Sequence, residues 1–213
     1  MENLIQYLVD LSCCWTSFLC IYVLFLQRET FFNYNRSYLL FSLIIGLVLP
    51  LLRLMPELLK LNIAEESIYN SYLAQGTAVV AKNIADTSMY WATYSFLILT
   101  IYFLGVLIFS VMLIKGLLGI RKLELGAELV EYDDYILVQS AEVHLPFSFF
   151  RKVYLSKKLD LDKDISQIMK HEIAHIKGWH SVDIVLVELI KILLWFHPLI
   201  YIYKSAIRQS HEF

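Results

Sequence analysis

Long apolar runs separated by short polar connections dominate the first half of the chain. Predominantly apolar residues fill positions 4–26, 38–55 and 90–114, and the last of these runs contains no charged residue. A helix needs about 20 residues to cross a hydrocarbon core about 30 Å thick. We therefore predict three transmembrane helices, which together with an outer segment at 56–89 make residues 1–114 a transmembrane region.

The pattern changes in the second half. Stretches rich in β-branched and aromatic residues, at 135–138 and 149–155, predict a small sheet within residues 128–159. A strand at 148–155 would offer backbone groups to which an extended substrate could pair. Apolar residues then recur at helical spacing from Ile165 until Gly178, which predicts a helix that ends there.

A helical hairpin is predicted at the end of the chain. An apolar helix that starts at Ser181 is interrupted at Pro198, and a second helical stretch starts at Leu199. Each half is too short to cross a membrane. We therefore interpret Pro198 as the corner of a hairpin that returns the last residues to the start of the first helix.

Composition and charge agree with lipid as a solvent. The chain is 58% hydrophobic and 18% charged, against about 25% charged residues in soluble domains. Its net charge of -2 and the lack of a long basic run argue against a nucleic-acid partner. Basic residues follow the first and third apolar runs, namely Arg28, Arg36, Lys115, Arg121 and Lys122. They predict that the chain is cytoplasmic after each of these two runs and that the N-terminus lies outside.

The helix that ends at Gly178 carries the chemistry. Residues 171–175 read His-Glu-Ile-Ala-His, and on a helix His171 and His175 lie one turn apart on one face, ready to bind one Zn²⁺. Zinc lowers the pKa of a bound water to about 7. Glu172 beside it is the candidate general base that takes the proton from this water and delivers it to the leaving amine.

A catalytic zinc site needs a third protein ligand. The metzincin pattern would place it at Ser181, which is not a ligand, so that class is disfavoured. Asp183, Glu188, His197, His211 and Glu212 are the remaining candidates. The hairpin puts His197 at its far corner and returns Glu212 to the metal. A glutamate ligand there would make the site a gluzincin. Glu188 is spaced to form an ion pair with Lys191 on one face of its helix. His180, His211 and His144 are candidates for supporting the site without binding the metal.

Two segments resemble a known family. HEIAHIKGWHSVD and LLWFHPLIYIYKSAIRQSHEF resemble the BlaR/MecR-type integral-membrane metallopeptidases, the β-lactam sensor-transducers and their relatives, over about residues 90–213. The resemblance implies zinc ligands at His171, His175 and Glu212, a base at Glu172, a cytoplasmic zinc domain in a bacterial plasma membrane, and cleavage that relays an external signal to an intracellular protein. The family pattern continues beyond the glutamate, so we expect residues 115–213 to be a zinc domain truncated at its C-terminal end.

The expected protein is therefore mainly α-helical, with three transmembrane helices and a small α+β gluzincin-like zinc peptidase domain that contains a sheet and a helical hairpin. The expected activity is that of a zinc metalloendopeptidase acting on a protein or peptide substrate, and a second copy of the chain is a candidate partner. The alternative is a non-catalytic membrane signal transducer with a structural zinc site. Glu172 favours the enzyme, because a structural site has no need of a carboxylate beside the metal.

Overall fold

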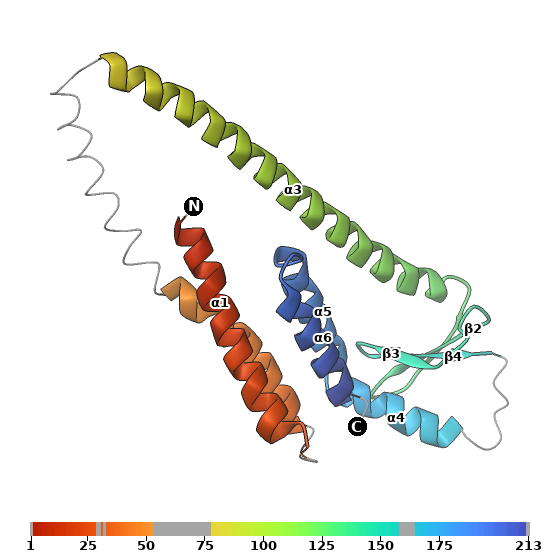
Figure 1. The fold of residues 1–213 in the computed structure, drawn as a ribbon. Helices are drawn as coiled ribbons and strands as arrows, with labels where there is room; N and C mark the ends of the chain where they lie inside the picture. Colours follow the sequence, from red (N-terminus) through yellow and green to blue (C-terminus); the bar gives the residue numbers. More distant parts are fainter. Residues whose placement is uncertain (1, 29–30, 32, 53–77, 158–164, 212–213) are drawn as a thin grey trace. The chain divides into compact units, whose positions relative to one another are not determined.

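The computed structural model describes residues 2–28, 31, 33–52, 78–157 and 165–211. Within the segment 78–157, side chains are described from residue 94 onwards. The chain divides into two compact units, Met1–Gly105 and Val106–Phe213, which are described in turn. The part of the chain that is described is mostly helical and contains one small mixed sheet (Figure 1).

The first unit contains a pair of antiparallel apolar helices. Helix α1 (Glu2–Ile21) continues as a short π-helix, η1 (Tyr22–Leu26), and packs against a helix at Asn33–Leu52. The indole Nε1 of Trp15 donates a hydrogen bond to the carbonyl of Leu43 at 3.1 Å. A side chain at Gly46 would come within 2.4 Å of Trp15 Cδ1, so glycine at this position lets the two helices approach closely.

Within the described residues, three helices are long and apolar enough to cross a membrane, as predicted: Asn3–Leu26, Asn33–Leu52 and Tyr94–Glu124. Their outward faces carry large exposed apolar side chains such as Phe25, Phe41 and Phe96, which fits a membrane protein. The second helix begins before the predicted position 38, and positions 53–55 lie outside the described residues. Placement in a membrane and orientation stay predictions.

The third apolar helix is much longer than the predicted span at 90–114. Helix α3 runs from Ala78 to Glu124, so it takes in the end of the predicted outer segment; residues 56–77 of that segment lie outside the described residues. Lys115 does not interrupt the helix, because lysine has a good helix propensity. The helix ends only before Gly126, whose φ of 79° is a left-handed conformation typical of the residue after a helix.

The predicted small sheet is present in the second unit. It has four strands in the order β1-β2-β4-β3, namely β1 (Glu128–Glu131), β2 (Ile136–Ser140), β3 (Phe147–Phe149) and β4 (Lys152–Ser156). Strands β2 and β4 are parallel, and the two outer pairs are antiparallel. The prediction of a single strand at 148–155 is wrong, because the chain reverses at Phe150 and Arg151 and forms the β3-β4 hairpin.

Helices cover both faces of the sheet, which explains the unbroken apolar runs in β2 and β4. On one face, Leu137, Val153 and Leu155 are buried against side chains of helix α4 (Ile165–Lys177). On the other face, Val138 and Tyr154 are buried against the end of α3. Glu124, the last residue of α3, accepts hydrogen bonds from Lys152 Nζ at 2.6 Å and Tyr154 Oη at 2.7 Å, and so ties α3 to β4.

The predicted hairpin follows α4. Helices α5 (His180–Leu193) and α6 (Pro198–His211) lie side by side and antiparallel, and α6 begins at Pro198 (Figure 1). The predicted pair between Glu188 and Lys191 forms within α5, and Lys204 Nζ of α6 joins it at 2.5 Å from Glu188 Oε1. Phe109 of α3 stacks on Trp195 at the turn of the hairpin, with ring centroids 6.2 Å apart.

Candidate metal centre

Helix α4 brings the two histidines of the zinc motif together. His171 and His175 lie one turn apart, and their Nε2 atoms are 2.9 Å from each other, with ring planes at 90°. Two nitrogens bound to a tetrahedral zinc at about 2.0–2.1 Å lie about 3.3 Å apart. The two imidazoles therefore need only a small opening to share one metal ion between the same two nitrogen atoms.

Glu172 occupies the adjacent face of α4. Its neighbours along this face, Ile168, Met169 and Ile176, pack on the sheet, so the glutamate is drawn towards the sheet and is buried. On the rest of the surface of α4, His171 is exposed and His175 is half-buried. Glu172 is therefore a buried carboxyl group that follows the exposed His171 directly along the helix.

His180 contacts the second histidine of the motif from outside. Its Nδ1 lies 2.6 Å from Nδ1 of His175, the ring nitrogen that does not face His171. If Nε2 of His175 binds a metal, Nδ1 of His175 carries the proton and donates a hydrogen bond to Nδ1 of His180. This bond fixes both the tautomer and the ring orientation of His175. Gly178 makes room for this contact, since a Cβ there would lie 2.5 Å from His180 Nε2.

A buried pair at the base of the hairpin supports His180 in turn. His211, the last residue of α6, stacks on the His180 ring with centroids 4.2 Å apart and planes at 13°. Its Nε2 lies 3.1 Å from Asp183 Oδ2 of α5, and both side chains are less than a tenth exposed. Asp183 thus supports His211, His211 supports His180, and His180 supports His175, so residues from α5 and α6 act on one imidazole of α4.

The structure places the other predicted site residues as follows. Glu212, the predicted third ligand, lies outside the described residues and is the next residue after His211. His144 lies exposed in the loop between β2 and β3, and no contact among the described residues joins it to the histidines. His197 is buried at the corner of the hairpin, at the opposite end from His211 and Asp183, where burial lowers its pKa.

Among the described residues, no group of three or more His, Cys, Asp or Glu side chains is arranged to hold a metal ion. The donor set nevertheless suits zinc, because His171 and His175 provide two converging nitrogens and His180 supports the second of them. The role of Asp183 as the partner of His211 was not predicted. Its spacing of three residues from His180 places both on one face of α5 and is the sequence signal that could have indicated it.

No protein-family model matches this chain, and no curated protein matches its sequence.

Proposed function

We propose that this protein is a membrane-embedded zinc metalloendopeptidase of the BlaR/MecR type, with His171, His175 and Glu212 as zinc ligands and Glu172 as the general base. The observation that carries the proposal is the pair of Nε2 atoms 2.9 Å apart on α4, next to a buried glutamate and supported by His180. A chance HEXXH pattern on a surface helix would not require this surrounding set of buried polar contacts.

The proposed reaction is hydrolysis of a peptide bond. When bound, zinc supplies a Lewis acid that polarises the substrate carbonyl and lowers the pKa of water. Glu172 accepts a proton from the attacking water and delivers it to the amine nitrogen as the carbon–nitrogen bond breaks. His180 holds His175 in the tautomer whose Nε2 lone pair faces the metal, and the Asp183–His211 pair holds His180 in place.

A protein or peptide substrate has a place to bind beside this helix. Strand β3 is an edge strand of the sheet, where it is paired with β4 alone among the described strands, and it packs against α4. An extended substrate that adds to the free edge of β3 would lie along the zinc helix, with its backbone held by strand-type hydrogen bonds. The proposal includes a cytoplasmic zinc domain, a bacterial plasma membrane and a role in relaying a signal from outside.

The test compares zinc content and cleavage in the full chain purified in detergent. The wild type should hold about one zinc per chain and cleave an unfolded fluorescent casein. Glu172→Gln should keep zinc and lose cleavage, whereas His175→Ala and Glu212→Ala should lose both. A wild-type chain that binds zinc but does not cleave, like Glu172→Gln, would favour the alternative of a non-catalytic transducer with a structural zinc. Cleavage retained in Glu172→Gln would refute the role of this glutamate.

A further inference from the structure

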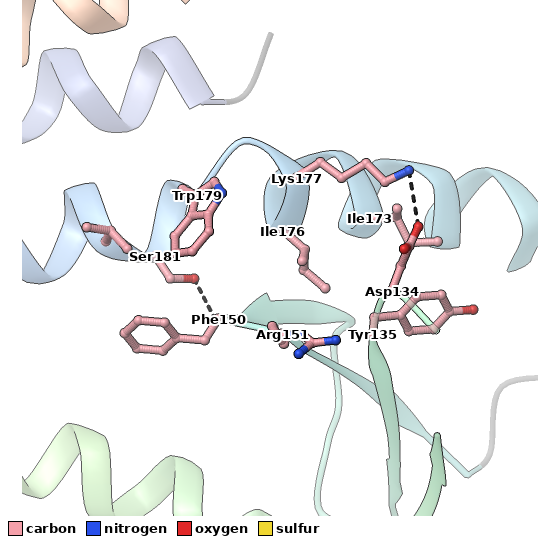
Figure 2. A pocket seen from close by; sticks show the side chains of 10 residues that line it. Asp134, Tyr135, Phe150, Arg151, Ile173, Ile176, Lys177, Trp179 and Ser181 are labelled. Atoms are coloured by element: carbon pink, nitrogen blue, oxygen red, sulfur yellow. Dashed lines mark hydrogen bonds and ion pairs between the residues drawn. The ribbon is translucent and has the colours of Figure 1, made fainter. Parts of the chain in front are cut away.

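A concave site lies on the same helix as the zinc motif but on a different flank. It is a pocket of about 220 Å³, and none of the proposed zinc ligands or Glu172 is among its lining residues. Its wall is Ile173 and Ile176 of α4, and its mouth is formed by the β3-β4 turn and by the turn between α4 and α5 (Figure 2). Ile173 lies within the HEXXH motif, so the pocket and the zinc site share one turn of helix.

Two aromatic side chains are held at the mouth by unusual backbone conformations. Phe150 and Trp179 have φ angles of 51° and 58°, and they are the two non-glycine residues with positive φ in the described part of the chain. Bulky residues rarely adopt this conformation because it costs free energy, and such strain is concentrated at functional sites. Both rings are nevertheless exposed, Trp179 to 69%, so their own burial does not repay the strain.

A buried hydroxyl group fixes the distance between the two aromatic residues. The backbone N–H of Phe150 donates a hydrogen bond of 2.8 Å to Oγ of Ser181, which is buried at the start of α5. Figure 2 shows Trp179, Phe150 and Ser181 together at one end of the pocket, and the Lys177–Asp134 ion pair at the other end. The pocket therefore has Trp179 and Phe150 at one end, and the Lys177–Asp134 ion pair together with Tyr135 at the other.

The charges at the pocket favour an acidic ligand. Two basic side chains, Arg151 and Lys177, and one acidic side chain, Asp134, line it. Lys177 is paired with Asp134 at 3.4 Å, whereas the Arg151 guanidinium donates to the neutral carbonyl of Asp133. Among the described lining residues, Arg151 therefore has no carboxylate partner, and its guanidinium recognises carboxylates through a planar set of donors.

We propose that this pocket is an exosite for the polypeptide substrate, which it binds through one aromatic side chain next to a carboxylate. An apolar cavity of about 150 Å³ can hold benzene, so this pocket has room for a phenyl ring against Ile173, Ile176 and Trp179. The neighbouring Asp or Glu of the ligand pairs with Arg151. The inference rests on the proposed function, because it assigns the pocket to the substrate that β3 and the zinc helix would bind.

A membrane surface is the other partner that exposed aromatic and basic side chains can indicate. The site is concave, however, and one of its two basic residues is already paired with an aspartate. A bilayer would be contacted by a protruding aromatic residue, whereas a hollow of this volume fits a single side chain. Phe150 also follows directly after β3, so a peptide paired along this strand would extend towards the pocket.

The test measures peptide binding by fluorescence anisotropy, with the full chain in detergent and in a Glu172→Gln background that prevents cleavage. The probe is fluorescein-labelled GSGEFEGSG, and the matched peptides are GSGEAEGSG and GSGQFQGSG. The phenylalanine peptide should bind about tenfold more tightly than its alanine counterpart, the ratio that corresponds to the loss of one well-buried anchor. Trp179→Asn should abolish this difference, since asparagine tolerates the left-handed backbone but lacks the indole.

Arg151→Gln should weaken binding of the glutamate peptide severalfold and leave the glutamine peptide unaffected. Leu145→Ala, an exposed apolar residue outside the pocket, is the control and should change nothing. Equal binding of the phenylalanine and alanine peptides, in chains that hold zinc, would overturn the exosite and leave the proposed peptidase function unaffected. Peptide preference in a chain without zinc or cleavage would support the pocket and count against the proposed function.

The membrane outcome is tested with the chain reconstituted in vesicles that contain brominated acyl chains. Replacing Trp179 by phenylalanine should leave the quenched part of the tryptophan fluorescence unchanged. A decrease in that quenched part would place the Trp179 indole in lipid and overturn the exosite.

Discussion

Substitution of Gly178 by alanine should weaken zinc binding without unfolding the protein. The new methyl group would lie 2.5 Å from Nε2 and 2.7 Å from Cδ2 of His180, and 3.2 Å from the carbonyl oxygen of Ala174. Favourable contacts of carbon begin at about 3.5 Å, so the His180 ring must move by about 1 Å. The ring cannot move freely, because it is stacked on His211 and hydrogen-bonded to His175.

The size of the effect follows from the contact that is lost. The contact between the two Nδ1 atoms is 2.6 Å long, and a displacement of about 1 Å takes it out of the length and alignment that a hydrogen bond requires. Loss of a partner that orients a metal-binding histidine typically reduces metal affinity by about 10–100-fold. The effect on the metal-free protein is smaller, because the loss of a hydrogen bond worth about 0.5–1.5 kcal/mol is partly offset by the lower conformational entropy of the unfolded chain when glycine is replaced by alanine.

Zinc affinity can be measured in detergent by competition with a chromophoric chelator, and metal-free stability by thermal unfolding in the presence of EDTA. Gly119→Ala is the matched control, since no described atom lies within 4 Å of a Cβ at that position. A double variant, Gly178→Ala with His180→Ala, should bind zinc no more weakly than His180→Ala alone, because both changes remove the same contact. Wild-type zinc affinity in Gly178→Ala would refute the role assigned to His180.

Two further predictions concern the hairpin. Asp183→Ala should destabilise the metal-free protein by about 1–3 kcal/mol, because it leaves the buried His211 nitrogen without its acceptor. The control Asp134→Ala, which breaks an exposed ion pair, should cost less than about 1 kcal/mol. Equal losses of stability in thermal unfolding of the two variants would contradict this reasoning. Burial alone would raise the pKa of Glu188, but hydrogen bonds from Lys191 and Lys204 outweigh burial and lower it below 4.5. A carboxyl group whose pKa is lowered in the folded state stabilises the protein above its unfolded pKa, and this contribution is lost as the pH falls through the folded value. The unfolding midpoint of the wild type should therefore fall more steeply below pH 4.5 than that of Glu188→Gln, and parallel curves would exclude the contribution of this residue.

Much of the architecture could be predicted because it depends on local patterns. The apolar runs predicted three helices, the β-rich stretches predicted the sheet, and Gly178 and Pro198 predicted where α4 ends and α6 begins. Local patterns failed where a distant contact decides the structure. The reversal at Phe150 and Arg151 contains neither glycine nor proline and is held by Ser181, 31 positions further along the chain.

In the candidate site, too, contacts set by local spacing could be predicted and contacts between distant residues could not. The spacing of His171 and His175 predicts that their rings meet, because a helix places residues four apart on one face. The Asp183–His211 pair joins residues 28 positions apart, one near the start of α5 and one at the end of α6, at the base of the hairpin. Its formation depends on the lengths of α5 and α6 and on the angle of the turn between them, and short-range spacing does not determine these quantities.

The uninterrupted course of α3 into the sheet has a mechanical consequence. Its last turns are packed on the sheet and anchored through Glu124, so no flexible linker separates the long apolar helix from the strands next to the HEXXH helix. A loop would absorb a twist or a push, whereas the part of α3 within the second unit, from Val106 to Glu124, passes it on to the strands. A displacement of α3 by one residue, about 1.5 Å along its axis, must either carry β4 and its neighbours with it or break the bonds to Glu124.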